Sequence, residues 1–254
     1  MYYEVSGDGF PIVMIMGWGG TTEWWDPAMV EELSKQYKVV IFDNRGIGKT
    51  DKPEMKYTVE MFATDTVGLM SELKIEKAHV LGISMGGMIA QEIALNYPER
   101  IEKLVLCSTH SGMSFFSKIM TKLLLFFAKR RMKDPEKGPE LLISLLFTKD
   151  FIKENREKID EIRADFTDSP TSQDDFARQF HAVKKFNTRK RLQNVDKPTL
   201  IMHGKKDALI SYKEGLRLAD LIPYAKLALF DNTAHALFTQ ETERVLITLT
   251  DFLA

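Results

Sequence analysis

The stretch Gly82-Ile83-Ser84-Met85-Gly86 lies between a short apolar run, residues 78–81, and a helical pattern over residues 88–95. A serine in a sharp turn between a strand and a helix is held in a strained conformation that projects its hydroxyl away from the sheet. Glycines two positions before and after the serine leave room for that turn. A glycine-rich turn without any chemistry would show the same letters. The rest of the chain therefore decides whether Ser84 is a nucleophile.

The composition is that of an ordinary globular protein. The 254 residues are 44% hydrophobic and 28% charged, which predicts one α/β domain with an insertion. A net charge of −1 gives no support for nucleic acid or an anionic membrane as a partner. The single cysteine, Cys107, cannot form an internal disulfide. There is no signal-peptide pattern and no run of about 18 apolar residues, so we expect a cytoplasmic protein without integral membrane association.

Short apolar runs that suit buried strands recur along the chain and alternate with helical patterns. This alternation predicts right-handed crossovers and a mainly parallel α/β sheet of about seven strands, flanked by helices. Thr58 is expected to cap a helix that runs to Leu73. Parallel sheets of this kind bind ligands beyond the carboxyl ends of their strands. The expected strands are residues 2–6, 12–16, 38–42, 78–81, 101–107, 199–203 and 226–230.

The pattern changes after the strand that ends near Ser108. No buried strand is expected from residue 112 to residue 195. An all-helical insertion at this edge of the sheet is expected to cover the site as a cap. The chain is therefore divided into a core, residues 1–111 and 192–254, and a helical cap, residues 112–191. Helical patterns within the insertion cover residues 113–131, 139–148, 151–165 and 172–185.

Three loops at one sheet edge carry Ser84, Asp207 and His235, in this order along the chain. Serine is a weak nucleophile until a base removes its proton, and a carboxylate that holds the base fixes its tautomer and stabilises the imidazolium. Singly, Asp207 fits a turn or helix-capping residue, and His235 fits a surface histidine. Together at one edge, the three residues favour nucleophilic catalysis. Asp231 is a rival acid, but its closeness to His235 along the chain favours a turn residue.

The motifs and their order resemble those of the α/β hydrolases, and the resemblance covers essentially the whole chain. The chain is similar to the compact, capped branch of carboxylesterases and enol-lactonases. The resemblance implies that Ser84 is the catalytic nucleophile, Asp207 the acid and His235 the general base. Haloalkane dehalogenases and epoxide hydrolases are also similar, but they carry aspartate at the nucleophile position. The matching stretches are Met16-Gly17-Trp18-Gly19-Gly20, Asp43-Asn44-Arg45-Gly46-Ile47-Gly48, residues 82–87, His203-Gly204-Lys205-Lys206-Asp207 and Ala234-His235.

The same resemblance places the oxyanion hole at two backbone N–H groups, those of Trp18 and Met85. Relatives usually carry His-Gly before the first donor, where this chain has Met16 and Gly17. This difference removes a supporting side chain but no backbone donor. Relatives also usually carry one more strand before residue 2, so we expect seven strands rather than eight.

Substrate contacts are expected from the oxyanion loop, the cap and the loop after Asp207. The cap begins with a run rich in aromatic residues and methionine, which suits a hydrophobic core as well as an acyl pocket. Docking of this run on a membrane surface is a weaker alternative. The candidate substrate-binding residues are Gly17, Phe116, Met120, Leu124 and Leu209.

Other polar residues fit structural roles better. The stretch 43–48 matches no phosphate-loop spacing. The resemblance implies that it is a structural turn in which Arg45 packs or forms an ion pair, with direct contact to the substrate as the weaker alternative. His203 ends a strand and fits a buried structural residue, whereas His110 and His181 are candidates to line the site. Basic residues fit a solvated face, with binding of an anionic part of a substrate as the weaker hypothesis. They are residues 129–131, 133, 184–185 and 189–191.

The expected activity is that of a serine esterase, which hydrolyses carboxylic esters with small to medium acyl chains through an acyl-enzyme. Hydrolysis of enol-lactones or of acyl thioesters such as acyl-CoA, hydrolysis of C–C bonds, and perhydrolysis without a cofactor are alternatives within the same fold. A receptor-like ligand binder that keeps the triad is an alternative from another class. The expected partner is a small-molecule ester rather than nucleic acid, and a homodimer is compatible with the sequence. No metal-ligand spacing occurs, and the mechanism requires neither metal nor cofactor.

Overall fold

The computed structural model describes residues 1–112, 137–168 and 172–254, which contain a seven-stranded sheet in the order β1-β3-β2-β4-β5-β6-β7. β1 pairs with β3 antiparallel, and all other neighbours are parallel. The predictions of a mainly parallel sheet and of seven strands are therefore confirmed. The strands are β1 (Tyr3–Ser6), β2 (Phe10–Ile15), β3 (Tyr37–Phe42), β4 (Ala78–Ile83), β5 (Ile101–Cys107), β6 (Thr199–Gly204) and β7 (Ala225–Phe230).

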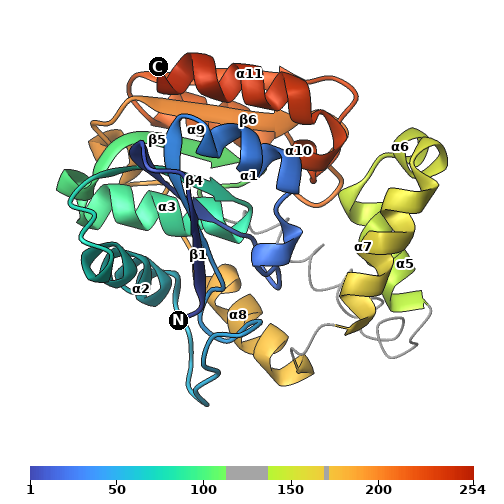
Figure 1. Cartoon of the computed structure of the whole chain (residues 1–254). Coiled ribbons are helices and arrows are strands. Elements are labelled where there is room, and N and C mark those ends of the chain that lie inside the picture. Colours follow the sequence, from blue (N-terminus) through green and yellow to red (C-terminus); the bar gives the residue numbers. More distant parts are fainter. Residues whose placement is uncertain (113–136, 169–171) are drawn as a thin grey trace.

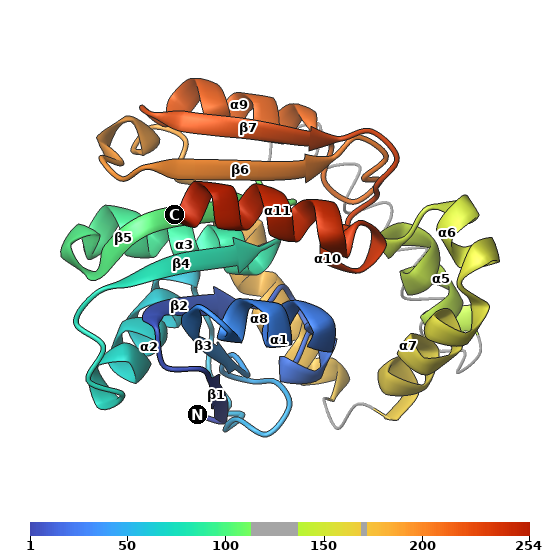
Figure 2. The same cartoon turned by 45° about the horizontal axis from the view of Figure 1, so that its top comes forward.

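The sheet separates two apolar layers, which explains why its central strands appear in the sequence as continuous hydrophobic runs. In β2, Val13 and Ile15 pack into one layer with α2, α3 and α9, while Ile12 and Met14 pack into the other with α1 and α11. Figures 1 and 2 show α1 and α11 on one face of the sheet and α2 and α3 on the other. The helices around the sheet are α1 (Pro27–Ser34), α2 (Val59–Glu72), α3 (Met85–Asn96), α9 (Lys213–Leu221), α10 (Leu237–Gln240) and α11 (Thr242–Leu253).

Capping side chains mark the beginning of α2 and the end of α6 (Lys149–Glu154). The Thr58 hydroxyl accepts a hydrogen bond from the Met61 N–H at 3.2 Å, so the predicted cap of α2 is confirmed. The helix predicted over residues 151–165 is instead two helices, α6 and α7 (Arg156–Asp168). Asn155 interrupts them because its side-chain amide donates to the Phe151 carbonyl and its backbone leaves the helical region.

The described part of the cap consists of α6 and α7 together with α5 (Lys137–Leu146) and α8 (Gln173–Lys185). Figure 2 places α5, α6 and α7 beyond the ends of the strands toward which the arrows of β6 and β7 point. These three helices share a small apolar cluster of Ile143, Phe147 and Ile159, which Ala236 of the core joins. The predicted helix 113–131 and the candidate residues Phe116, Met120 and Leu124 lie outside the described residues.

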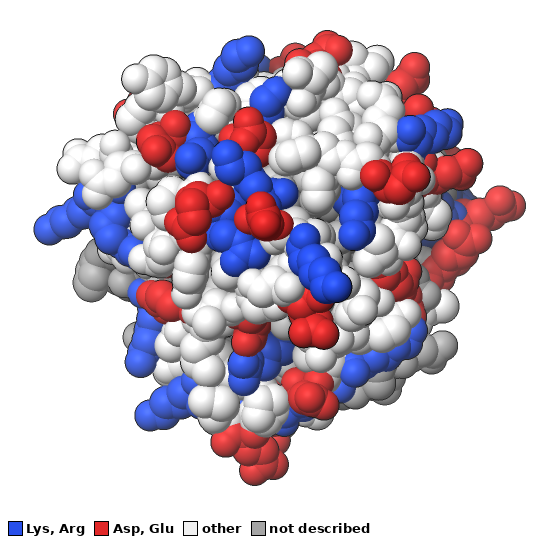
Figure 3. Space-filling view, turned by 60° about the vertical axis from the view of Figure 1, so that its left-hand side comes forward, with Lys and Arg blue, Asp and Glu red and all other residues white. Residues whose placement is uncertain are grey.

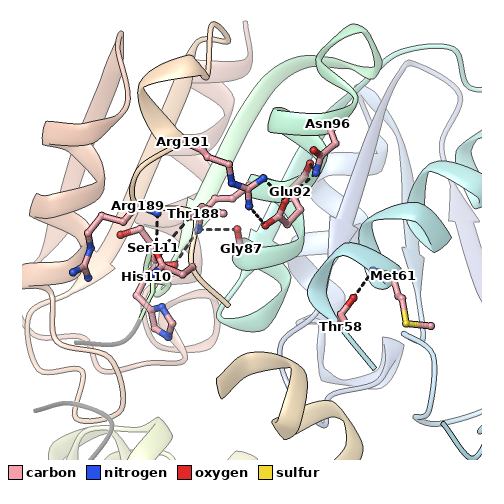
Figure 4. Close-up of polar contacts among 12 residues, drawn as sticks. Thr58, Met61, Gly87, Glu92, Asn96, His110, Ser111, Thr188, Arg189 and Arg191 are labelled. Atoms are coloured by element: carbon pink, nitrogen blue, oxygen red, sulfur yellow. Dashed lines mark hydrogen bonds and ion pairs between the residues drawn. The ribbon is translucent and has the colours of Figure 1, made fainter. Parts of the chain in front are cut away.

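The chain leaves and re-enters the core at one place, where the two segments pair. Gly112 and Asn187 form an antiparallel bridge, and the Thr188 N–H donates to the Ser111 carbonyl at 2.9 Å. Gln91 of α3 accepts a hydrogen bond from the Thr188 hydroxyl at 2.7 Å. The helix that follows Ser84 is therefore bonded to the segment that returns from the cap (Figure 4).

An ion pair and a hydrogen bond reinforce the same connection. Arg191 lies against Glu92 of α3, whose carboxylate is almost fully buried and also accepts from Asn96 (Figure 4). Arg189 donates to the Gly112 carbonyl at 2.8 Å. Both arginines are thus engaged with the protein, which favours a structural role for this part of the basic segment 189–191 over binding of an anionic substrate group.

The surface shows no large field of one sign on the face drawn in Figure 3, where acidic and basic side chains are interspersed. This distribution agrees with the small net charge of −1. Within the described residues, no helix is both long and apolar enough to cross a membrane.

We predict that burial of His79 makes folding pH-dependent. The ring is 4% exposed and lies 4.8 Å from the Phe10 ring and 5.9 Å from the Tyr37 ring. Burial, helped by the charge of Lys103, lowers the pKa of His79 from 6.5 to about 4. Between these values the unfolded chain binds a proton that the folded protein excludes, so stability is present above pH 6.5 and is lost as the pH falls toward 4.

The substitution His79→Phe should reduce this loss by on the order of 2 kcal/mol. The measurement is the free energy of unfolding in urea at several values between pH 6.5 and pH 4. Replacing the exposed His181 with alanine is the control. The free energy of unfolding of this variant should depend on pH in the same way as that of the wild-type protein. Equal losses in wild-type protein and in His79→Phe would contradict the assignment.

Candidate active site

Ser84 lies at the turn between β4 and α3, with φ of 56° and ψ of −116°. A non-glycine residue in the left-handed region is strained and persists only where the surroundings impose it. Here the Ser84 N–H donates to the Cys107 carbonyl of β5 at 2.9 Å. Gly86 is required on the other side of the turn, because a Cβ at this position would lie 1.9 Å from the Ile15 carbonyl oxygen. The turn therefore holds a half-buried serine at the carboxyl end of the central strand.

Asp207 and His235 meet at the carboxyl ends of β6 and β7. The Asp207 Oδ2 atom lies 2.7 Å from His235 Nδ1, and both side chains are buried. The other carboxylate oxygen accepts the N–H groups of Leu209 at 2.8 Å and Ile210 at 2.9 Å. Asp207 is thus a fixed acceptor that orients the His235 ring through Nδ1. The other ring nitrogen, Nε2, takes no part in this contact.

The environment keeps the Asp207 carboxyl ionised. Burial by itself would raise the pKa, but the charge of His235 and hydrogen bonds from His203 and His235 outweigh it, so the pKa lies well below its usual range. His203 is fully buried as expected, with its Nε2 atom 2.8 Å from the Ile210 carbonyl oxygen. The same atom lies 3.4 Å from Asp207 Oδ2, a proximity to the candidate acid that the sequence did not predict.

The rival acid, Asp231, has a different environment. Its side chain is 68% exposed and forms an ion pair with Lys205 at 2.5 Å. The carboxylate that contacts His235 is therefore Asp207, and Asp231 is the surface turn residue that its position along the chain indicated.

Ser108 and Thr109, which directly follow β5, connect the serine turn with the histidine loop. The Ser108 hydroxyl donates to the His235 carbonyl at 3.0 Å, and the Thr109 hydroxyl donates to the Ser84 carbonyl at 2.7 Å. β5 lies between β4 and β6 in the sheet, so the following loop reaches both neighbours. Sequence reasoning missed both residues, and their position directly after a buried strand was the only available signal.

The loop after β2 runs beside the serine. A Cβ built on Gly17 would lie 3.1 Å from the Ser84 Cβ and 3.7 Å from the Ser84 Oγ. Met85 begins α3, so its N–H is one of the four that have no acceptor within the helix. Among the described residues, the Trp18 N–H also has no hydrogen-bond acceptor. The two predicted oxyanion donors thus lie on the segments that flank Ser84.

The remaining candidates divide between structural and unassigned positions. Arg45 forms an ion pair with Asp65, with 2.7 Å between Arg45 Nε and Asp65 Oδ2, as a structural turn requires. His110 is buried and accepts from the Gly112 N–H, and burial lowers its pKa to about 4. His181 is exposed on α8. Leu209 is 39% exposed, and its role in substrate binding stays a prediction.

Within residues 1–112, 137–168 and 172–254, no group of three or more histidine, cysteine, aspartate or glutamate side chains is placed to hold a metal ion.

The sequence profile of the family described as alpha/beta hydrolase fold matches residues 11–242. The chain belongs to this family. It is 30% identical over 264 residues to the protein named "Putative carbamate hydrolase RutD" of Agrobacterium fabrum, with 100% of this chain and 98% of that protein covered. It is 29% identical over 263 residues to the 2-hydroxymuconate semialdehyde hydrolase of a Pseudomonas species, covering 98% and 88%.

A solved structure supports the same assignment. The enol-lactonase from Burkholderia xenovorans superposes with a TM-score of 0.86 at 26% identity, with 99% of this α/β hydrolase and 95% of the enol-lactonase covered. The family and its relatives establish this protein as a hydrolase.

We predict that Asp207→Asn will reduce turnover of a short-chain aryl ester about 10³- to 10⁴-fold, because an amide stabilises the wrong His235 tautomer and carries no charge. Asp231→Asn is the matched control, being the same change on a neighbouring loop, and should retain wild-type turnover. A comparable loss in both variants would show that the assignment of the acid is wrong.

Proposed function

We propose that this α/β hydrolase is a serine esterase that cleaves carboxylic esters with small to medium acyl chains through an acyl-enzyme intermediate. The observation that carries the proposal is the buried 2.7 Å contact between Asp207 and His235 at the sheet edge where Ser84 adopts its strained turn. A serine so placed needs a base, and a histidine held by an ionised carboxylate is suited to that role.

In the first half of the reaction the Ser84 oxygen attacks the ester carbonyl carbon while His235 takes the hydroxyl proton at Nε2. The carbonyl oxygen becomes an oxyanion, and the N–H groups of Trp18 and Met85 stabilise it. Collapse of the tetrahedral intermediate breaks the bond to the alkoxy group. His235 returns the proton to this leaving group, which departs as an alcohol and leaves the acyl group on Ser84.

In the second half a water molecule replaces the alcohol. His235 removes a proton from the water, whose oxygen attacks the acyl carbon, and the same two N–H groups stabilise the second oxyanion. Breakdown of this intermediate breaks the bond to Ser84, and His235 returns the proton to the serine oxygen. The products are the carboxylic acid and the free enzyme, and the electrostatic support from Asp207 serves both halves.

An ester is the preferred substrate class because an enol-lactone is an internal ester, so the similarity to an enol-lactonase supports ester chemistry at this site. The low pKa of the Asp207 carboxyl provides the ionised partner that an imidazolium requires with any acyl substrate. Enol-lactones, acyl thioesters and carbamates present a carbonyl that the same groups can attack, so they form the comparison panel.

We predict that a fluorophosphonate probe will label the wild-type protein at one site and that Ser84→Ala will abolish the labelling. Peptide mass spectrometry identifies the modified residue. Ser144→Ala, which removes an exposed serine from α5, is the control and should be labelled like the wild type. Undiminished labelling of Ser84→Ala would disprove the assignment of the nucleophile.

Steady-state turnover then separates an enzyme from a ligand binder. We expect many turnovers per protein molecule on short-chain aryl esters, with the rate falling as the acyl chain lengthens. Parallel assays with an enol-lactone, an acyl thioester and a carbamate rank the substrate classes. A single burst without turnover on every member of the panel would favour the receptor-like alternative.

A further inference from the structure

The oxyanion loop, residues 16–20, is held by hydrogen bonds on both sides of Trp18. The Met16 carbonyl accepts from the Asn44 side-chain amide at 3.1 Å, and the Gly17 carbonyl accepts from the Gly20 N–H at 3.2 Å. The Gly17 carbonyl and the Trp18 N–H belong to the same planar peptide group. The hydrogen bond from the Gly20 N–H to the Gly17 carbonyl therefore also orients the Trp18 N–H. Another group of this loop, the Gly19 N–H, is bound by a residue from the cap.

That residue is Gln179 of α8, which is fully buried. Its Oε1 atom accepts from the Gly19 N–H at 3.0 Å, and its Nε2 atom donates to the Arg45 carbonyl at 2.9 Å. One side-chain amide therefore connects the oxyanion loop with the loop after β3. Gly19 and Gln179 are 160 positions apart in the sequence.

The surrounding contacts place α8 directly against the same loop. The Trp18 indole N–H donates to the Phe176 carbonyl at 2.9 Å, and its ring lies 5.9 Å from the Phe176 ring and 5.2 Å from the Phe180 ring. Residues 176, 179 and 180 lie on one face of a helix. Gly19, with φ of +78°, leaves no room for a side chain, because a Cβ there would lie 2.4 Å from the Phe176 ring.

From these contacts we propose that Gln179 is a positioning residue for the oxyanion hole, and that it fixes the direction of the Trp18 N–H from the cap. The inference rests on the proposed function, since it requires Trp18 to be an oxyanion donor. Both polar atoms of the Gln179 side chain are bound to backbone groups of the protein. Gln179 acts through Gly19, whose peptide group follows Trp18 directly. The cap helix α8 is thereby part of the catalytic apparatus as well as a cover over it.

The first test is Gln179→Leu, which keeps a similar volume and removes both hydrogen bonds. We expect kcat for a short-chain aryl ester to fall about ten- to a hundredfold, because a misdirected donor loses stabilisation that exists only in the transition state. The KM should stay close to that of the wild type. Asp174→Asn, an isosteric change at an exposed position of α8, is the control and should leave both constants unchanged.

The second test is Gln179→Glu, which distinguishes positioning from a merely structural role. An ionised carboxylate can accept from the Gly19 N–H but cannot donate to the Arg45 carbonyl, whereas a protonated one can do both. Burial beside a carbonyl raises the pKa of such a carboxyl. The ratio of kcat in this variant to kcat in the wild type should therefore rise as the pH is lowered.

The outcomes separate this inference from the function on which it rests. Wild-type protein that neither turns over esters nor labels at Ser84 overturns the proposed function. Wild-type turnover together with an unchanged kcat in folded Gln179→Leu overturns the role of Gln179 alone. A Gln179→Glu ratio that does not change with pH also overturns it. If Gln179→Leu does not fold, the pH profile of Gln179→Glu decides the question by itself.

Discussion

The buried carboxylate of Asp207 imposes the strictest requirement on this structure. A charge removed from water must be compensated by nearby donors or opposite charges, and here four groups supply the compensation. His235 and His203 approach one oxygen, and the N–H groups of Leu209 and Ile210 bind the other. These partners come from β6, from the loop that follows it and from the loop that follows β7. The position of the His235 ring therefore depends on correct pairing of two strands, and it is set before any substrate binds.

The cap contacts the core beside two of the proposed catalytic groups. Gln179 of α8 binds the residue after Trp18, and the Leu146 carbonyl at the end of α5 accepts from the N–H of Ala236, the residue after His235, at 3.0 Å. Lys158 of α7 adds an ion pair at 2.7 Å with Asp26, which also caps α1. The contacts of Gln179 with Gly19 and of Leu146 with Ala236 are hydrogen bonds to backbone N–H groups, and such bonds have a defined direction. A shift of either cap segment would thus be transmitted to a catalytic group through one bond.

The sequence was sufficient to predict the strands, their parallel arrangement and the loops at their carboxyl ends, because these features follow from short-range periodicity and from chain order. It also indicated Asp207, rather than Asp231, as the candidate acid, although only the structure separates the two side chains, by burial and by the contact with His235. The break at Asn155 was not predicted, since a side-chain bond to the preceding turn leaves the apolar pattern unchanged. The approach of His203 to Asp207 required the geometry of the loop after β6.

Gln179 illustrates the limit of sequence reasoning most clearly. A glutamine on an amphipathic helix ordinarily predicts a solvent-facing position, and no local pattern points to a partner 160 residues away. The site nevertheless restricts which side chain can occupy it. It presents one N–H and one carbonyl, both removed from water, so the side chain must accept and donate at once. A hydrocarbon would leave two buried backbone groups unpaired, at about 1–3 kcal/mol each. An ionised carboxylate would face a carbonyl oxygen. A neutral amide satisfies both groups without a charge, and its two hydrogen bonds therefore do not depend on pH.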